Sequence, residues 1–151
     1  MSWQDRQPVL VGVGQVTQRE PDPRAAMGPL DLMAAAAKAA AADSGAGDGL
    51  LQALDQLTVI RLFADTSPRF VSPFGKQTNP PLSVARRIGA AAARQHVYTW
   101  PGGNMPQYCL NRLGEAITRG EVDAALVVGA EALATQKAAQ RQGVALDWAE
   151  D

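Results

Sequence analysis

Residues 98–128 read YTWPGGNMPQYCLNRLGEAITRGEVDAALVV and hold the clearest structural pattern of the chain. Aromatic and β-branched residues open the run, as is typical of a strand. Two glycines then precede a stretch of helix formers that ends at Gly120, a residue type common just after a helix. The apolar run at 124–128 is typical of a buried strand. The stretch therefore predicts a strand, a helix over 104–119 and a second strand, the arrangement that joins two parallel strands.

The same alternation of strand and helix patterns extends to both ends of the chain. Short apolar runs predict strands, and stretches rich in alanine or opened by proline predict helices. The predicted strands are 9–16, 57–63, 95–100 and 124–128, and the predicted helices are 30–45, 82–89 and 104–119, with room for one more helix after Glu131. This order predicts an α/β fold, a mixed and mostly parallel sheet with helices on both faces.

Composition limits the class of protein. The 151 residues are enough for about one domain, and 46% hydrophobic with 19% charged residues can form a buried core. A net charge of −1 gives no basic surface for nucleic acid or for an anionic membrane. The single cysteine excludes an intramolecular disulfide. No apolar run approaches the roughly 20 residues that span a bilayer, and MSWQDRQPVL lacks the apolar core of a signal peptide. We expect a cytoplasmic protein.

The glycine turn at residues 102–104 is the first candidate for a binding site. Gly102 and Gly103 allow a sharp turn, and Asn104 with Gln107 three residues later fits a capping box. A helix that begins there presents N–H groups that stabilise negative charge, whether on a bound anion or on a developing oxyanion. The alternative interpretation is an ordinary strand-to-helix turn.

The lone cysteine is a poor candidate for a nucleophile. Cys109 shares a helix face with Leu113, Ala116 and Ile117, and this face is expected to pack on the sheet. The thiol would lie roughly 9 Å along the helix from Gly103, at 1.5 Å per residue. Burial would raise its pKa, so we predict that Cys109 is a core residue.

Other motifs point to structure more than to chemistry. The run GVGQVT at 12–17 lacks the third glycine and the following helix that a dinucleotide site needs, and no P-loop, Gly-x-Ser-x-Gly turn or metal-ligand cluster is present. We expect His96 to be an ordinary surface or core histidine and Glu131 to anchor a loop by hydrogen bonds. Arg86 and Arg87 are expected on a solvated helix face.

The connection at residues 64–79 is long for a compact domain. It carries Arg69, Phe70, Phe74 and Lys76. These residues predict a loop packed under its own aromatic side chains. The alternative is a ligand or partner surface, with aromatic groups for burial and cations for a phosphate or carboxylate.

A family resemblance rests on several of these segments together. The run GGNMPQYCLNRLGEAITRGEVDAALVVGAEALA at 102–134 contains the pattern AI-x-x-G-x-x-D at 116–123, followed by Gly129-Ala130-Glu131. It resembles the nucleophile helix and the next strand of the thiolase superfamily, nearest to its acetyl-CoA acetyltransferase branch, with the sterol-carrier-type thiolases as relatives. PVLVGVGQVTQ at 8–18 and NPPLSVARRIGA at 79–90 resemble the same branch. The resemblance covers essentially the whole chain.

The resemblance implies a thiolase-like half-domain, with residues 1–151 forming part of the N-terminal domain. It implies an acyl-CoA thioester as substrate or ligand, with no bound cofactor, and it places the long loop near the subunit contact of a dimer. By the family's spacing, the reactive cysteine would fall at Gly103, which has no side chain to acylate. No catalytic residue is therefore assigned, and residues Gly102, Gly103 and Asn104 are assigned only to substrate binding.

A second departure concerns the rest of a thiolase. The asparagine-glutamate, glycine-histidine-proline and cysteine-glycine motifs of the family's second half do not occur in this sequence. We expect either a fragment of a longer enzyme or a short relative, with an exposed sheet edge that favours a homo-oligomer or a missing C-terminal half as partner. Two functions stay open: an acetyl-CoA acetyltransferase-like protein, and a degenerate thiolase-fold protein that binds acyl-CoA or a partner without turnover.

Overall fold

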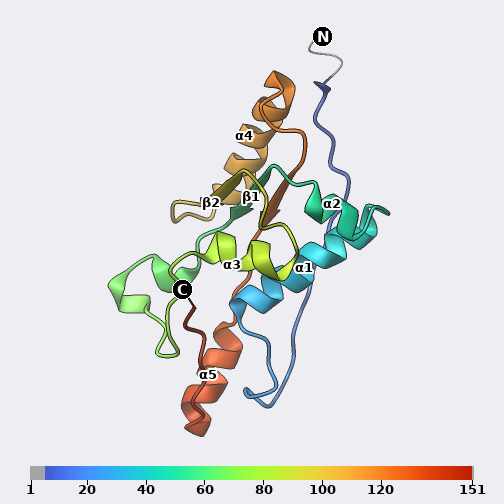
Figure 1. Ribbon diagram of the computed structural model, residues 1–151. Coiled ribbons are helices and arrows are strands. Elements are labelled where there is room, and N and C mark those ends of the chain that lie inside the picture. The colour runs from blue at the N-terminus through green and yellow to red at the C-terminus, as the bar shows by residue number, and fades with distance from the viewer. Residues whose placement is uncertain (1–5, 151) are drawn as a thin grey trace.

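Three parallel strands form the sheet at the centre of the molecule (Figure 1). The computed structural model describes residues 6–150, so the start of the segment inspected for a signal peptide and Asp151 lie outside the described residues. The strands are β1 (Gln56–Val59), β2 (Gln95–Tyr98) and β3 (Ala125–Val128). Their order is β2-β1-β3, with β1 paired in parallel to both neighbours. All three strands therefore end at the same edge of the sheet.

Helices cover both faces of this sheet. They are α1 (Pro29–Asp43), α2 (Asp48–Gln52), α3 (Pro80–Arg87), α4 (Met105–Arg119) and α5 (Leu133–Gln142), with two 3-10 turns, η2 (Phe63–Asp65) and η3 (Pro68–Phe70), in the long loop. Figure 1 shows α1 and α3 in front of the strands and α4 behind them. The α/β fold class is confirmed, and the strands of the described sheet are parallel throughout.

The core lies between α1, α3 and β1. Met33 and Ala37 of α1 are fully buried with Val84 of α3 and Leu57 of β1. The small alanine side chains let α1 lie close to its neighbours, which is why an alanine-rich stretch with few large residues still closes a core. The prediction of a helix closely packed on the sheet is correct.

The predicted strand at 9–16 is wrong for the described structure. This segment runs without strand hydrogen bonds, and its apolar side chains from Val9 to Val13 are exposed. It is attached to helices instead of to the sheet: the Val13 N–H donates to Asp43 Oδ2 over 2.9 Å, and a Cβ on Gly12 would lie 2.2 Å from the Ala40 carbonyl oxygen. An apolar run becomes a buried strand only where its backbone pairs with a neighbouring strand, and here the contacts with α1 take the place of that pairing.

The expectation of a solvated face at 86–87 holds only for Arg86. Arg87 is partly buried and donates two hydrogen bonds to Glu150, at 2.9 and 2.6 Å, and a third to Asp31, at 2.9 Å. These bonds raise the pKa of Arg87 and hold the C-terminal segment against α3 and α1. The partner Glu150 lies 63 residues away in sequence, so a local helical pattern could not reveal it.

Among residues 6–150, none of the helices combines the length and the apolar character that a membrane span requires.

Candidate functional site

The carboxyl ends of the three strands meet the start of α4 at one edge of the sheet. In open α/β sheets, ligands bind in the crevice outside these strand ends. A cavity of about 420 Å3 lies here, lined by Ile60, Arg61, Pro106, Val127, Val128 and the segment 129–131. Residues that follow β1 and β3 therefore share a cavity with the first turn of α4.

The glycine corner at residues 102–104 is exposed and open. A Cβ placed on Gly103 would meet no other atom within 4 Å. The Met105 N–H donates to the Gly102 carbonyl over 3.1 Å and closes the turn into α4. The structure thus confirms the strand, the tight turn and the helix, whereas substrate binding at Gly102, Gly103 and Asn104 stays a prediction.

The predicted capping box at this corner is wrong. Asn104 precedes α4, but its side chain makes no cap hydrogen bond and its backbone is already helical. Gln107 does not reach back to the cap, because its Nε2 donates to Asn111 Oδ1 over 2.9 Å on the exposed side of the helix. The first turn of α4 is therefore closed by the backbone, without the Asn104 side chain.

Backbone N–H groups remain available at the corner. Within the described residues, the N–H groups of Gly103 and Asn104 donate to no acceptor, and Pro106 has no N–H to offer. Together with the partial positive charge of the α4 N-terminus, they could stabilise a carbonyl oxygen that develops negative charge. The corner thus offers backbone donors, and its residues Gly102, Gly103 and Asn104 supply no thiol or hydroxyl that could attack such a group.

Cys109 lies inside, as predicted. Its residue is 7% exposed and packs with Leu113 on the buried face of α4. Burial raises the pKa of its thiol, so the reactive thiolate is disfavoured. The one sulfhydryl of the chain therefore does not replace the missing nucleophile.

A polar cluster that the sequence analysis did not identify supports the strand ends. The Arg61 guanidinium carbon lies 4.3 Å from the centre of the Tyr98 ring, and Arg61 Nε donates to the Thr99 carbonyl over 2.7 Å. The Arg61 N–H donates to Thr99 Oγ1 over 2.9 Å. A signal existed: Tyr98 ends β2 and Arg61 follows β1, so parallel pairing places both at one edge.

The Tyr98 hydroxyl connects this cluster to the long loop. It donates to Asp65 Oδ2 over 2.5 Å and accepts the Leu62 N–H over 3.0 Å. Burial, followed by the hydrogen bond to Asp65, raises the pKa of Tyr98 well above its usual range. Tyr98 is therefore neutral at physiological pH and serves as a hydrogen-bonded support.

Glu131 anchors the loop, as the sequence predicted. Its Oε1 accepts the Phe63 N–H over 2.6 Å. Loss of water around the carboxylate raises the pKa of Glu131, while the hydrogen bond from Phe63 opposes that shift and Asp65 adds to it. Glu131 is thus a structural carboxylate that lines three cavities, and its raised pKa means a raised affinity for a proton.

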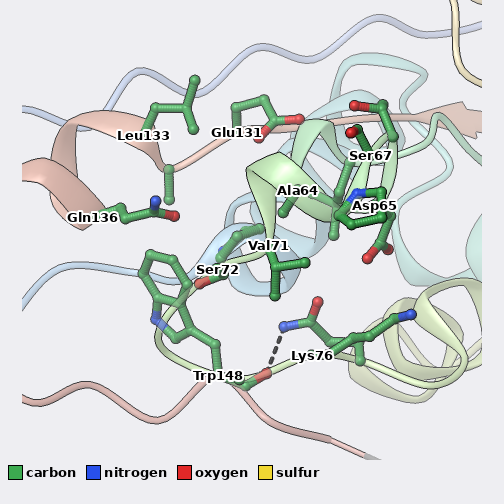
Figure 2. A pocket seen from close by; sticks show the side chains of 17 residues that line it. Ala64, Asp65, Ser67, Val71, Ser72, Lys76, Glu131, Leu133, Gln136 and Trp148 are labelled. Carbon is green, nitrogen blue, oxygen red and sulfur yellow. Dashed lines mark hydrogen bonds between the residues drawn. The ribbon is translucent and has the colours of Figure 1, made fainter.

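A second cavity, of about 320 Å3, adjoins the first across Glu131. Figure 2 shows Glu131, Leu133 and Gln136 on one side of it, the loop with Asp65 and Ser67 facing them, and Trp148 on the C-terminal segment. Its lining mixes both charge signs, since it includes Asp65, Glu131 and Lys76.

The long loop packs on its own aromatic residues and on the C-terminal segment. The Phe63 and Phe70 rings lie 4.3 Å apart, and the Phe74 and Trp148 rings lie 5.5 Å apart, edge to face. The prediction of a loop packed under its own aromatics holds in part: Phe70 packs on Phe63 and Phe74 on Trp148, while Phe63 and Phe70 are 44% and 43% exposed. Phe70 and Lys76 are exposed at the surface of the loop. Their role in an interface stays a prediction.

Neither His96 nor a metal-binding cluster contributes to this site in the described part of the chain. His96 lies within β2 and is partly buried, and its Nε2 has no hydrogen-bond partner among the described residues. Across residues 6–150, no three His, Cys, Asp or Glu side chains are placed to hold a metal ion.

Comparison with solved structures finds chains that are similar to this one. The chain is similar to the crystal structure of a monomeric SCP2-thiolase-like protein type 1 from Mycobacterium smegmatis, with 35% sequence identity and a TM-score of 0.63. The match covers 81% of this chain and 23% of that chain, so this chain spans about a quarter of the neighbour's length. No protein-family model and no curated protein matches the sequence. The chain has a thiolase-like fold.

Proposed function

We propose that this thiolase-fold protein acts on or binds acyl-CoA thioesters, as an acetyl-CoA acetyltransferase-like protein. The thioester carbonyl would lie over the corner at residues 102–104, and the acyl group would face the apolar part of the cavity beside Pro106 and Val127. The support comes from the open helix start at the carboxyl edge of the sheet and from the similarity to an SCP2-thiolase-like protein.

One observation carries this proposal: the corner is open and has no nucleophile. A Cβ on Gly103 would meet no atom within 4 Å, and Cys109 is buried in α4. Polarisation of a thioester carbonyl by the N–H groups of Gly103 and Asn104 needs no side chain at position 103. The nucleophile for acyl transfer would have to come from elsewhere than this corner, for example from further thiolase-like polypeptide.

The missing side chain favours a second candidate function. A thiolase-fold protein that holds acyl-CoA or a partner subunit without turnover needs the fold and the corner, but no thiol. In this case Gly103 makes room for the ligand where an enzyme would place its acyl acceptor.

The test compares the full-length protein with its Gly103→Cys and Cys109→Ala variants. Acetyl-CoA binding is measured by calorimetry, and acyl transfer by thiolysis of acetoacetyl-CoA. Binding in all three proteins with thiolysis only in Gly103→Cys supports the binder. Turnover that survives Cys109→Ala supports a transferase that uses other residues. Absence of acetyl-CoA binding from all three proteins contradicts both functions.

We also propose which kind of partner covers the exposed surfaces of this chain. The Mycobacterium smegmatis protein is described as monomeric and is much longer than this chain. This difference favours further thiolase-like polypeptide over a homo-oligomer as the partner that covers the exposed surfaces of this chain. A cytoplasmic location stays a prediction.

A further inference from the structure

One cation in the cavity at the strand ends has no acidic partner. Arg61 follows β1 and lines the cavity of about 420 Å3 that reaches Pro106 in the first turn of α4. Among residues 6–150, the arginines that are partly buried are Arg6, Arg61 and Arg87. Arg6 pairs with Asp123 and Arg87 with Glu150, whereas no carboxylate of the described residues lies within ion-pair distance of Arg61. A partly buried charge without a counter-ion is costly, so this guanidinium favours an anion from outside the chain.

The guanidinium of Arg61 is held in one orientation. Its carbon lies 4.3 Å from the centre of the Tyr98 ring, and its Nε donates to the Thr99 carbonyl over 2.7 Å. The Tyr98 ring is fixed in turn, because its hydroxyl donates to Asp65 over 2.5 Å. These contacts restrict the side chain before any ligand arrives, which reduces the entropy that binding would cost.

The two terminal nitrogens of Arg61 remain available. The contacts with Tyr98 and Thr99 use the flat face and Nε, and Nη1 and Nη2 have no hydrogen-bond partner in the described part of the chain. Two parallel N–H groups of a planar guanidinium match the two oxygens of a carboxylate. The arrangement therefore fits a ligand carboxylate better than an isolated neutral acceptor.

The rest of the cavity lining says where such a carboxylate would lie. Apart from Arg61 and Glu131, the lining side chains are apolar or absent, so the space suits a hydrocarbon chain. Glu131 is not the partner of Arg61, since its Oε1 accepts the Phe63 N–H over 2.6 Å. Its negative charge repels an anion from its own side of the cavity. The ligand carboxylate is thus expected beside Tyr98 and Thr99, where Arg61 lies.

We propose that Arg61 binds a carboxylate at the end of the acyl group, so that the preferred ligands are coenzyme A thioesters of dicarboxylic acids. The inference rests on the proposed function, which places the thioester at residues 102–104 and the acyl group in this cavity. The phosphates of coenzyme A are the alternative anions. They are separated from the thioester by the whole pantetheine arm, whereas Arg61 lines the same cavity as Pro106. Arg61 is in this view a residue that determines specificity, not a catalytic one.

The test compares acyl-CoA thioesters in matched pairs. The pairs are malonyl-CoA with propionyl-CoA, succinyl-CoA with butyryl-CoA, and glutaryl-CoA with pentanoyl-CoA, and the members of each pair differ only by a carboxylate in place of a methyl group. Binding to the full-length protein is measured by calorimetry. We expect at least one dicarboxylic member to bind roughly tenfold to 100-fold more tightly than its partner, the range of a hydrogen bond to a charged group.

Three variants assign this preference to Arg61. Arg61→Met removes the charge and keeps an apolar side chain, so we expect the preference to disappear while the affinity for the methyl member changes little. Arg61→Lys keeps the charge without the planar pair of donors and should retain part of the preference. Arg141→Met is the control, because Arg141 is exposed in the last turn of α5. It should keep the full preference.

The outcomes separate this inference from the proposed function. Equal affinity of the unmodified protein for both members of every pair overturns the inference without any variant and leaves acyl-CoA binding standing. A preference that survives Arg61→Met also overturns it. Equal weakening of both members by Arg61→Met overturns it too, because Arg61 would then contact coenzyme A itself or only support the strand ends. Absence of binding for all six thioesters contradicts the proposed function, and this inference falls with it.

Discussion

At position 103 the corner has room for a side chain that the sequence does not provide. A cysteine placed there meets no atom within 4 Å of its Cβ, so we expect Gly103→Cys to fold normally. Its thiol would lie in solvent beside the positive end of α4, which lowers a thiol pKa. In the Cys109→Ala background, we expect alkylation by iodoacetamide about tenfold faster than in the unmodified chain, where the thiol is buried.

The rate of alkylation is followed by intact mass. Cys109→Ala alone is the control and must take up no label, because Cys109 is the only cysteine. If Gly103→Cys reacts no faster than the buried Cys109, the corner is closed in solution, and binding at residues 102–104 loses its basis.

Gly12 supports a close contact between backbones. Because a Cβ would lie 2.2 Å from the Ala40 carbonyl oxygen, Gly12→Ala must push the N-terminal segment away from α1. We expect a loss of roughly 1–3 kcal/mol in the free energy of unfolding, measured with urea. Gly49→Ala is the control, since its Cβ meets nothing within 4 Å and alanine favours the helix α2. Equal effects of the two substitutions would contradict the close contact.

The roles of some residues could be predicted from the sequence, and those of others could not. Burial of Cys109 and the loop-anchoring role of Glu131 follow from helical spacing and from position at a strand end. The part played by Gly12 depends on Ala40, and that of Arg87 on Glu150. Both partners are distant in sequence and become visible only once the elements are placed.

At the scale of elements, a partly buried ion pair holds the C-terminal segment against α3. Glu150 accepts from both terminal nitrogens of Arg87, which lowers the pKa of Glu150 below its ordinary 4.5. A carboxyl whose pKa falls on folding stabilises the protein above its unfolded pKa, and this stability is lost as pH falls through the folded value. We expect Glu150→Gln to cost roughly 1–3 kcal/mol at pH 7, and the difference from the unmodified chain to vanish in acid.

Urea unfolding at a series of pH values checks this expectation. Glu121→Gln is the control, because Glu121 pairs with Arg119 on the solvated surface, where screening leaves little effect. A Glu150→Gln penalty that is the same at pH 7 and in acid would show that lost packing, and not the ion pair, is responsible.

Elements with a strong internal pattern were predictable and those defined by pairing were not. The helices α1 and α4 match the predicted ranges closely, since alanine content and Gly120 mark them locally. The short helix α2 was not predicted, and the strands β1 and β2 end earlier than their apolar runs. The segment 9–16 has the composition of a strand, yet helix contacts prevent its pairing.

At the scale of the molecule, the described sheet has both of its edges unpaired. The alternation of strands and helices was sufficient to predict the α/β class, because that class follows from element order. The thiolase-like fold was implied by the resemblance of residues 8–18, 79–90 and 102–134. An apolar slot lies between residues 8–14 and residues 125–129. It could not be predicted, since it depends on the distance at which α1 and α4 hold the N-terminal segment. An unfilled apolar slot beside a free strand edge is a site for association.

We therefore predict that the 151-residue chain self-associates through this region when its slot is unfilled. Val9 and Val11 line the slot and are 73% and 56% exposed, so replacing both with lysine should cost little stability while opposing contact with a second strand edge. Sedimentation velocity should show oligomers of the unmodified chain that grow with concentration, and mainly the 15.9 kDa monomer for Val9→Lys/Val11→Lys. Val71→Lys is the control, because Val71 is a similarly exposed valine, at 58%, on the long loop away from the slot. If Val71→Lys dissociates the oligomers and the double variant does not, the chain associates through the long loop. The slot is then not the interface.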